Sequence, residues 1–143
     1  TLLLAYQQKF VDKFLSISFK YDHVLYCITN EIFSKYSPEW GWYWSDYIKE
    51  KAKVAGIGTE VTEMFQTVNI KHYQHKASLD FPEKYSYVEL SQNSFNSNQE
   101  HWDYLQCVRN YVAPNPRPIN HVKLYGGLIG SWTSGPTHGI ERF

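Results

Sequence analysis

A polar amide and a carboxylate, Asn30 and Glu31, stand directly behind a run of apolar, β-branched and aromatic residues at 24–29. Such a run is typical of a parallel strand that is covered on both faces. Parallel sheets place their chemistry at the carboxyl ends of their strands, where a carboxylate can bind a ligand or transfer a proton. Asn30 and Glu31 are therefore candidate site residues.

Further polar residues follow two other predicted strands in the same way. Segment 59–65 has β-branched residues at alternate positions and carries Glu63 near its end, and segment 85–90 closes on a polar cluster that contains Gln92 and Asn93. Because each residue follows a separate parallel strand, we expect them to converge with Asn30 and Glu31 at one edge of the sheet. Purely structural roles remain open: Glu63 as a hydrogen-bond partner of other site residues, and the amides as loop-forming residues.

The elements that must position these residues alternate along the chain. Helices are predicted over 5–20, from Ser37-Pro38 to a C-cap at Gly56, and from the capping-box pattern at 97–100 to 112. Strands are predicted at 24–29, 59–65, 85–90 and 118–125. Strands that alternate with helices in this way predict an α/β fold with a parallel sheet and right-handed crossovers.

Residues 66–79 show no clean helical or strand period and predict a long surface loop beside a site. His72 and His75 in this loop raise a metal-dependent alternative, with His121 or His138 as a further ligand. A zinc site usually needs three or four ligands, and the spacing provides no clear third one. We therefore expect no metal and no other cofactor, and the metal-dependent hydrolase is the less favoured alternative.

The chain has 14 basic and 14 acidic residues, and aromatic residues make up 17% of it. Because the charges balance, no overall field favours a nucleic acid or an anionic membrane as a partner. No segment approaches the roughly 18 apolar residues of a membrane span. The aromatic side chains suit partly buried positions with their polar tips in water, or platforms on which sugar rings stack.

Several segments carry a resemblance to a known family. Asn30-Glu31 resembles the Asn-Glu pair that ends the fourth strand of retaining glycoside hydrolases with eight-stranded βα barrels. VTEMFQ at 61–66, the run at 88–112 and PRPINHVKLYGG at 116–127 resemble the later strands of bacterial carbohydrate-active barrels of the apiosidase-like group. The resemblance implies that residues 1–143 are a fragment of one TIM-barrel-like domain, about half a barrel, from roughly the third helix through the loop after the seventh strand.

The resemblance also implies roles for the candidate residues. Glu31 would be the general acid/base, and Asn30 would contact the 2-hydroxyl of the sugar. Apart from the resemblance, their position at a strand end makes Gln92 and Asn93 candidate substrate ligands, and Trp132 would either stack on a sugar or cover the mouth of the barrel.

One departure from the family pattern concerns the second carboxylate of a glycosidase. Retaining barrels carry their nucleophilic glutamate after the seventh strand, but Lys123 stands near that position. Glu63 is the nearest catalytic candidate by its place after a strand, with Glu89 and Glu141 as weaker ones. We expect a glycoside hydrolase that cleaves a polysaccharide or oligosaccharide; the alternative is a non-catalytic carbohydrate-binding or scaffold protein that has lost the nucleophile.

The resemblance to bacterial secreted enzymes further implies an extracellular or periplasmic location, although residues 1–143 contain no recognisable signal peptide. Half a barrel would leave strand edges uncovered, together with apolar surface on what should be the inner face of the barrel. We therefore expect either the rest of the barrel or a homo-oligomeric partner to cover the open sheet.

Overall fold

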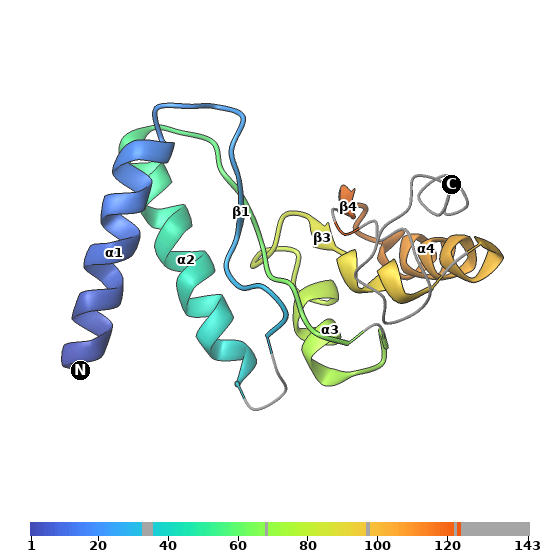
Figure 1. The fold of residues 1–143 in the computed structure, drawn as a ribbon. Coiled ribbons are helices and arrows are strands. Elements are labelled where there is room, and N and C mark those ends of the chain that lie inside the picture. Colours follow the sequence, from blue (N-terminus) through green and yellow to red (C-terminus); the bar gives the residue numbers. More distant parts are fainter. Residues whose placement is uncertain (33–35, 68, 97, 122, 124–143) are drawn as a thin grey trace.

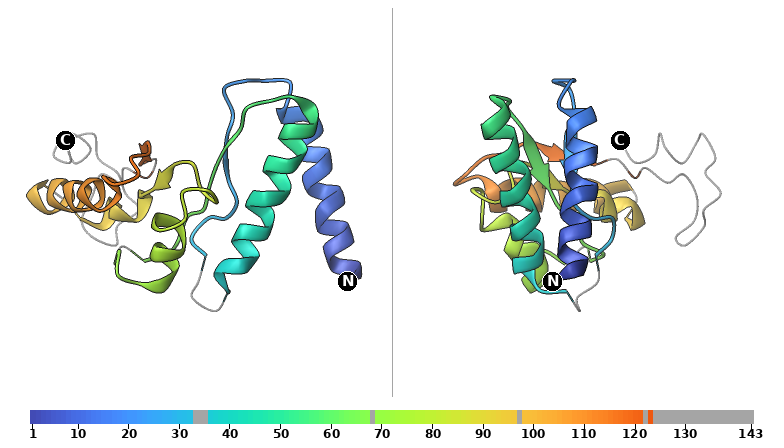
Figure 2. Two further views of the ribbon diagram at one scale, coloured as in Figure 1. Left: turned by 180° about the vertical axis from the view of Figure 1, so that it is seen from behind. Right: turned by 90° about the vertical axis from the view of Figure 1, so that its left-hand side faces the viewer.

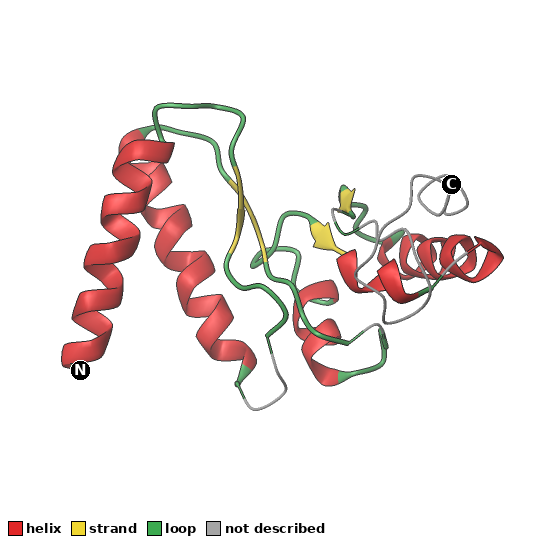
Figure 3. Ribbon diagram, in the orientation of Figure 1, coloured by secondary structure: helices red, strands yellow, loops and turns green. Residues whose placement is uncertain are grey.

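The computed structural model describes residues 1–32, 36–67, 69–96, 98–121 and 123. Helices supply most of the regular structure and the strands are short (Figure 3). In chain order the elements are α1 (Leu2–Ser18), β1 (Leu25–Cys27), α2 (Pro38–Ala55), β2 (Glu60–Thr62), α3 (Tyr73–Leu79), β3 (Val88–Glu89), the 3₁₀ helix η1 (Ser91–Phe95), α4 (Asn98–Val112) and β4 (Ile119–Asn120). The protein is therefore of the mixed α/β class, as its sequence predicts.

The ends of the first two helices follow local rules. Helix α1 begins earlier than predicted because the Thr1 hydroxyl accepts the Leu4 N–H at 3.4 Å and caps it. Helix α2 has its predicted limits, with Pro38 at its first position. Gly56 ends α2 in the left-handed conformation, at φ 70°, which costs glycine little. The Ser37 side chain, in contrast, makes no capping hydrogen bond.

The strands form two parallel pairs. β1 pairs with β2, where Tyr26 lies opposite Val61, and β3 pairs with β4, where Val88 lies opposite Ile119. All of these strands are shorter than the sequence predicts, because a strand extends only as far as its neighbour offers backbone partners.

Hydrogen bonds just before β3 join the two pairs. The Ser86 N–H donates to the Val61 carbonyl at 3.0 Å, and the Thr62 hydroxyl donates to the Tyr87 carbonyl at 2.7 Å. Successive residues of β2 thus meet successive residues of the segment entering β3, so the two run in the same direction. The described strands lie in the order β1, β2, β3, β4, each joined to the next by a helical crossover.

The helices cover one face of this sheet. α1 and α2 lie side by side against β1 and β2, whereas α3 and α4 lie by β3 and β4 (Figures 1 and 2). One apolar cluster joins the first two helices to the first two strands: Leu15, Tyr26, Ile48 and Val61. A second joins α3, β3 and α4: Leu79, Val88, Leu90, Val108 and Val112.

Because side chains alternate along a strand, the neighbours of these apolar residues point to the opposite face of the sheet. That face, which we call the polar face, carries Cys27, Thr62, Glu89 and Asn120. Thr62 and Glu89 are buried there. The exposed large apolar side chains are concentrated instead on α1, and they include Leu3, Tyr6, Phe10, Phe14 and Ile17. This differs from the prediction, which placed uncovered apolar surface on the inner face of the sheet.

The prediction of an irregular loop over 66–79 is wrong, because Tyr73–Leu79 forms α3. Two helical turns are too short to establish a visible 3.6-residue period. His72 begins α3 as its N-cap, with Nδ1 accepting the Gln74 N–H at 3.3 Å. At the other end, the Arg117 guanidinium donates to the Ser78 and Leu79 carbonyls at 3.1 and 2.6 Å. A local side chain thus caps the start of this short helix, and a side chain from a distant segment stabilises its end.

None of the helices within the described ranges has both the length and the apolar character of a membrane span. The glycine-rich segment that follows the last predicted strand, including Trp132 and His138, lies outside the described residues, as does Glu141.

Candidate functional site

Glu31 is the only non-glycine residue with positive φ in the described part of the chain, at 56°. The left-handed conformation costs such a residue roughly 1–2 kcal/mol. The next residue resumes parallel pairing: Ile32 forms a bridge with Phe65, and its N–H donates to the Met64 carbonyl at 3.0 Å. The backbone turn at Glu31 is therefore held in place by regular pairing immediately after it. Strain of this kind concentrates at functional sites.

The Glu31 carboxylate forms an ion pair with Lys123, which follows β4: Nζ donates to Oε1. The Lys123 side chain is 14% exposed and that of Glu31 31%. The Lys123 N–H donates to the Ser91 hydroxyl at 3.3 Å, which fixes the lysine backbone at the end of β3. The hydrogen bond from Lys123 is the main cause that lowers the pKa of Glu31. A general acid needs the opposite shift.

Gln92 lies beside this ion pair and is 4% exposed. Its amide contributes to the lowered pKa of Glu31, so the two side chains are near each other. Within the described residues, however, no hydrogen bond to Gln92 Nε2 satisfies ordinary distance and angle limits. Gln92 therefore acts on Glu31 through its amide donor without forming a hydrogen bond of ordinary geometry.

Glu89 lies on the polar face of β3 and is 5% exposed. Its Oε1 accepts the Ser91 N–H at 2.6 Å, and its Oε2 accepts Asn120 Nδ2 from β4 at 2.7 Å. Residue Cys27 of β1 keeps exposed surface, but burial of its thiol, followed by the charge of Glu89, raises the pKa of that thiol to about 12. The carboxylate of Glu89 therefore acts across the polar face as far as β1.

Ser91 connects these two groups, since its N–H binds Glu89 and its hydroxyl binds the backbone of Lys123. We call the resulting set the strand-end cluster. It comprises Glu31, Glu89, Ser91, Gln92, Asn120 and Lys123.

Glu63 also follows its strand, but its side chain turns to the helix face. It is 2% exposed, and it accepts hydrogen bonds from Tyr85 Oη at 2.6 Å and Thr29 Oγ1 at 3.2 Å. A Cβ on Gly41 of α2 would lie 2.1 Å from Glu63 Oε2, so α2 approaches this carboxyl closely. Burial raises the pKa of Glu63 against the opposing effect of the two hydroxyls. Glu63 is thus packed beneath α2 and lies outside the strand-end cluster.

The remaining predicted residues are placed differently from one another. Asn93 is fully buried, donates to the His101 carbonyl at 3.1 Å and accepts from Asn96 at 2.8 Å, so its amide holds the turn into α4. Asn30 is exposed beside Glu31. Of the predicted set, the structure brings Glu31 and Gln92 together, and it does not add Glu63 or Asn93 to them.

Three members of the cluster were not assigned a site role from the sequence, namely Asn120, Ser91 and Lys123, and Glu89 ranked only as a weak candidate. The alternation at Ile119-Asn120 was a usable signal, because a buried apolar residue places its neighbour on the opposite face. No pattern in the sequence around Lys123 or Glu31 indicated that these two residues would be in contact.

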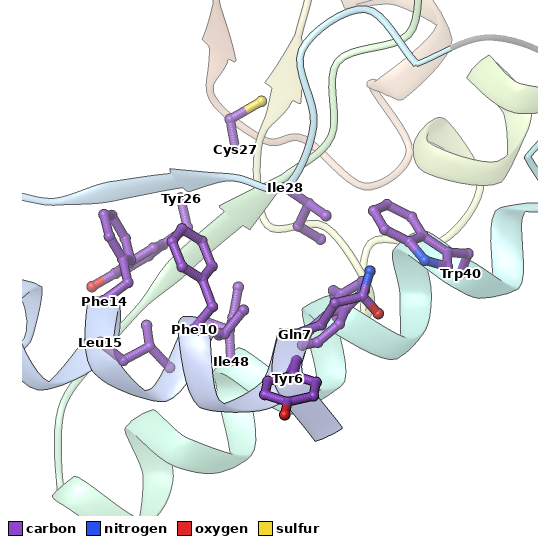
Figure 4. A pocket seen from close by; sticks show the side chains of 12 residues that line it. Tyr6, Gln7, Phe10, Phe14, Leu15, Tyr26, Cys27, Ile28, Trp40 and Ile48 are labelled. Atoms are coloured by element: carbon purple, nitrogen blue, oxygen red, sulfur yellow. The ribbon is translucent and has the colours of Figure 1, made fainter. Parts of the chain in front are cut away.

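An apolar cavity of about 590 Å³ lies between α1, α2 and β1 (Figure 4). Aromatic side chains from both helices, including Tyr6, Phe10, Phe14 and Trp40, line it together with Tyr26 of the strand. Of the described residues that line this cavity, none carries a carboxylate or a cationic side chain. It lies on the helix side of the sheet and therefore does not form part of the strand-end cluster.

The histidines proposed for a metal site do not assemble into one within the described residues, where no group of three or more His, Cys, Asp or Glu gathers. His72 caps α3, and His75 is buried with its Nε2 against the Thr67 carbonyl.

Comparisons with protein-family models, with curated proteins and with solved structures find no match for this chain. Its function is therefore inferred from its residues and their geometry.

Proposed function

We propose that this chain is part of a βα barrel of the glycoside hydrolase type and that it binds a saccharide at the strand-end cluster. The observation that carries the proposal is the contact of Glu31 with Lys123, which brings the ends of the first and fourth described strands to one polar site. Carboxylate, amide and ammonium groups that converge at the carboxyl ends of parallel strands match the polar groups that orient ligands in such sheets.

The contact between Glu31 and Lys123 favours a curved sheet, and a barrel requires one. Neighbouring strands lie about 4.8 Å apart, so β1 and β4 would be separated by about 14 Å in a flat sheet. The side chains of Glu31 and Lys123 meet more easily when the sheet curves toward its polar face. A barrel has this curvature, with helices outside and polar residues inside.

The remaining strands of the barrel, or a second copy of the chain, would pair with the outer edge of β1 and cover the exposed apolar residues of α1. A location outside the cytoplasm, extracellular or periplasmic, belongs to the same proposal. Light scattering on the 143-residue segment tests the requirement for a partner: a stable, monodisperse monomer with cooperative unfolding would contradict the half barrel.

Binding without hydrolysis is the function that the cluster supports best. Glu31 has a lowered pKa, so it stays ionised and is poorly suited to donate a proton to a glycosidic oxygen. Glu63 has the raised pKa expected of a general acid, but its side chain packs against α2. The second carboxylate of an acid/base pair is thus missing at the position where the sequence predicts it.

Hydrolysis of glycosidic bonds is the second candidate, and the strained backbone of Glu31 favours it. In this case Glu31 would act as general acid/base after a substrate displaces Lys123, and Glu89 on the polar face would supply the second carboxylate. The chemistry requires both carboxylates to reach the same glycosidic bond.

A glycan array followed by calorimetry on the full-length protein tests the proposal. We expect Asn120→Ala to weaken binding about tenfold, the effect of losing one hydrogen bond near a charged group. Asn110→Ala, the same substitution at an exposed position of α4, is the matched control and should have no effect. Absence of binding to every glycan would contradict the proposal.

Product analysis on each bound glycan then separates the two candidates. Binding with no cleavage products supports the binding protein. Cleavage that disappears in Glu31→Gln while the fold is retained supports the hydrolase, and cleavage that persists in this variant removes Glu31 from the acid/base role.

A further inference from the structure

The Glu31 carboxylate occupies a small site for anions at the strand-end cluster. Lys123 provides the positive charge, and the Nε2 donor of Gln92 acts on the same carboxylate, although their contact falls outside ordinary hydrogen-bond limits. Ammonium and amide donors that converge on one carboxylate can equally bind a carboxylate or sulfate that comes from outside. Glu31, the side chain that occupies this site, belongs to a residue with a strained backbone.

We propose that the saccharide bound at the strand-end cluster is acidic, and that its carboxylate or sulfate group replaces the Glu31 carboxylate beside Lys123 and Gln92. This inference rests on the proposed function and specifies the class of saccharide. Glu31 then acts as an internal competitor that keeps Lys123 paired while the site is empty.

The two partners of the ion pair differ in how firmly they are held. Lys123 is the less exposed, and its backbone is bound to the Ser91 hydroxyl at the end of β3. Glu31 is more exposed, adjoins exposed Asn30, and is held in the left-handed conformation. Rotation of the Glu31 side chain toward solvent would cost little packing and would free the lysine. The lysine is therefore the fixed half of the site and the glutamate the exchangeable half.

Gln92 gives an external anion an advantage over Glu31. A poorly formed hydrogen bond from a buried amide donor is costly, and the contact of Gln92 Nε2 with Glu31 falls outside ordinary hydrogen-bond limits. A ligand sulfate has more oxygens than the Glu31 carboxylate, and a ligand carboxylate has more positional freedom than a side chain attached to the backbone. It can therefore accept from Lys123 and Gln92 at the same time.

Two carboxylates oppose the binding of an anion. Glu89 faces the cluster, although its oxygens are already bound by the Ser91 N–H and the Asn120 amide. The displaced Glu31 also remains nearby. Affinity for the acidic saccharide therefore depends on the charge of Lys123, and added salt should weaken it.

Calorimetry on the full-length protein with charged and neutral forms of the same saccharide tests the inference. The probes are oligogalacturonate and its methyl ester, and a sulfated galactan oligosaccharide and its desulfated form. We expect at least one acidic form to bind about tenfold more tightly than its neutral counterpart. The two pairs of probes distinguish a carboxylate from a sulfate.

Three variants test the exchange itself. Glu31→Gln removes the competitor at equal size and should strengthen binding of the acidic form several-fold. Lys123→Gln should abolish the preference for the acidic form, and Lys123→Arg, which keeps the charge, should retain part of it if the glutamine variant does not fold. Lys53→Gln, at an exposed position of α2, is the control and should leave all affinities unchanged.

Equal affinity for acidic and neutral forms would overturn the inference and leave saccharide binding intact. Weaker binding of the acidic form in Glu31→Gln would also overturn it, because Glu31 would then be a ligand of the sugar. Failure to bind any saccharide would instead remove the proposed function.

Discussion

Lys123 contacts Glu31 although the two residues stand 92 positions apart and follow strands that are not neighbours in the sheet. The contact joins the carboxyl ends of β1 and β4. It also lowers the pKa of Glu31, the residue that the sequence marks most clearly as functional. Variants at Lys123, Glu31, Gly41 and Glu63 distinguish the effect of this contact on stability and pKa from the effect of the packing around it.

Replacing Lys123 with glutamine should raise the pKa of Glu31 toward its ordinary value. In the wild type this pKa is lower in the folded than in the unfolded chain. The ion pair therefore stabilises the fold above the ordinary glutamate pKa, and this stabilisation is lost as the pH falls through the folded value. Nuclear magnetic resonance titration of the Glu31 carboxyl carbon measures the shift directly. Lys51→Gln, which breaks the exposed pair with Asp12, should leave the titration of Glu31 unchanged.

The positive φ of Glu31 predicts a difference between two substitutions that both remove the ion pair. Glu31→Gly should be more stable than Glu31→Ala by about 0.5–1 kcal/mol, because relief of left-handed strain exceeds the extra entropy of glycine in the unfolded chain. Chemical denaturation of both variants measures the difference. At Asn30, which lacks a positive φ, the order should reverse and alanine should be the more stable. A glycine variant at position 31 no more stable than the alanine variant would contradict the strain.

Gly41 should be intolerant of a side chain, because a Cβ there would lie 2.1 Å from Glu63 Oε2 and 2.4 Å from Tyr85 Oη. We expect Gly41→Ala to destabilise the protein by about 1–3 kcal/mol despite the better helix propensity of alanine. Gly58→Ala has open space around its Cβ and serves as the control in thermal unfolding. Equal melting temperatures for the two variants would show that α2 does not press on the Glu63–Tyr85 pair.

Burial raises the pKa of Glu63 in the folded chain above its unfolded value near 4.5. The folded state then binds the proton more tightly, so this group stabilises the protein at low pH, and the stabilisation is lost as the pH rises through the folded pKa. Glu63→Gln should therefore gain stability relative to the wild type as the pH rises above about 4.5. The free energy of unfolding, measured by urea titration across this range, tests it. Glu60→Gln, at the exposed start of the same strand, should follow the wild-type curve.

A helix whose ends carry strong local sequence signals was predictable. A short helix was not, and neither was the length of the strands, which depends on pairing. Ser37-Pro38 and Gly56 mark both ends of α2, since proline fixes φ near its helical value and glycine readily adopts the left-handed conformation that ends a helix. Helix α3 was missed because Tyr73–Leu79 contains only two turns, and Arg117 from a distant segment satisfies carbonyls at its end. The strands were predicted too long, because their length depends on pairing with a neighbour.

The sequence by itself determined the α/β alternation, the limits of α2 and the location of Glu31 and Glu63 after their strands. Only the tertiary structure decided which of these carboxylates lies in the strand-end cluster. Alternation assigns residues to two faces, but it does not say which face the helices cover, and Glu63 lies on the covered one. The pairing of Glu31 with Lys123 likewise depends on how β1 and β4 are arranged in space, which no short stretch of residues specifies.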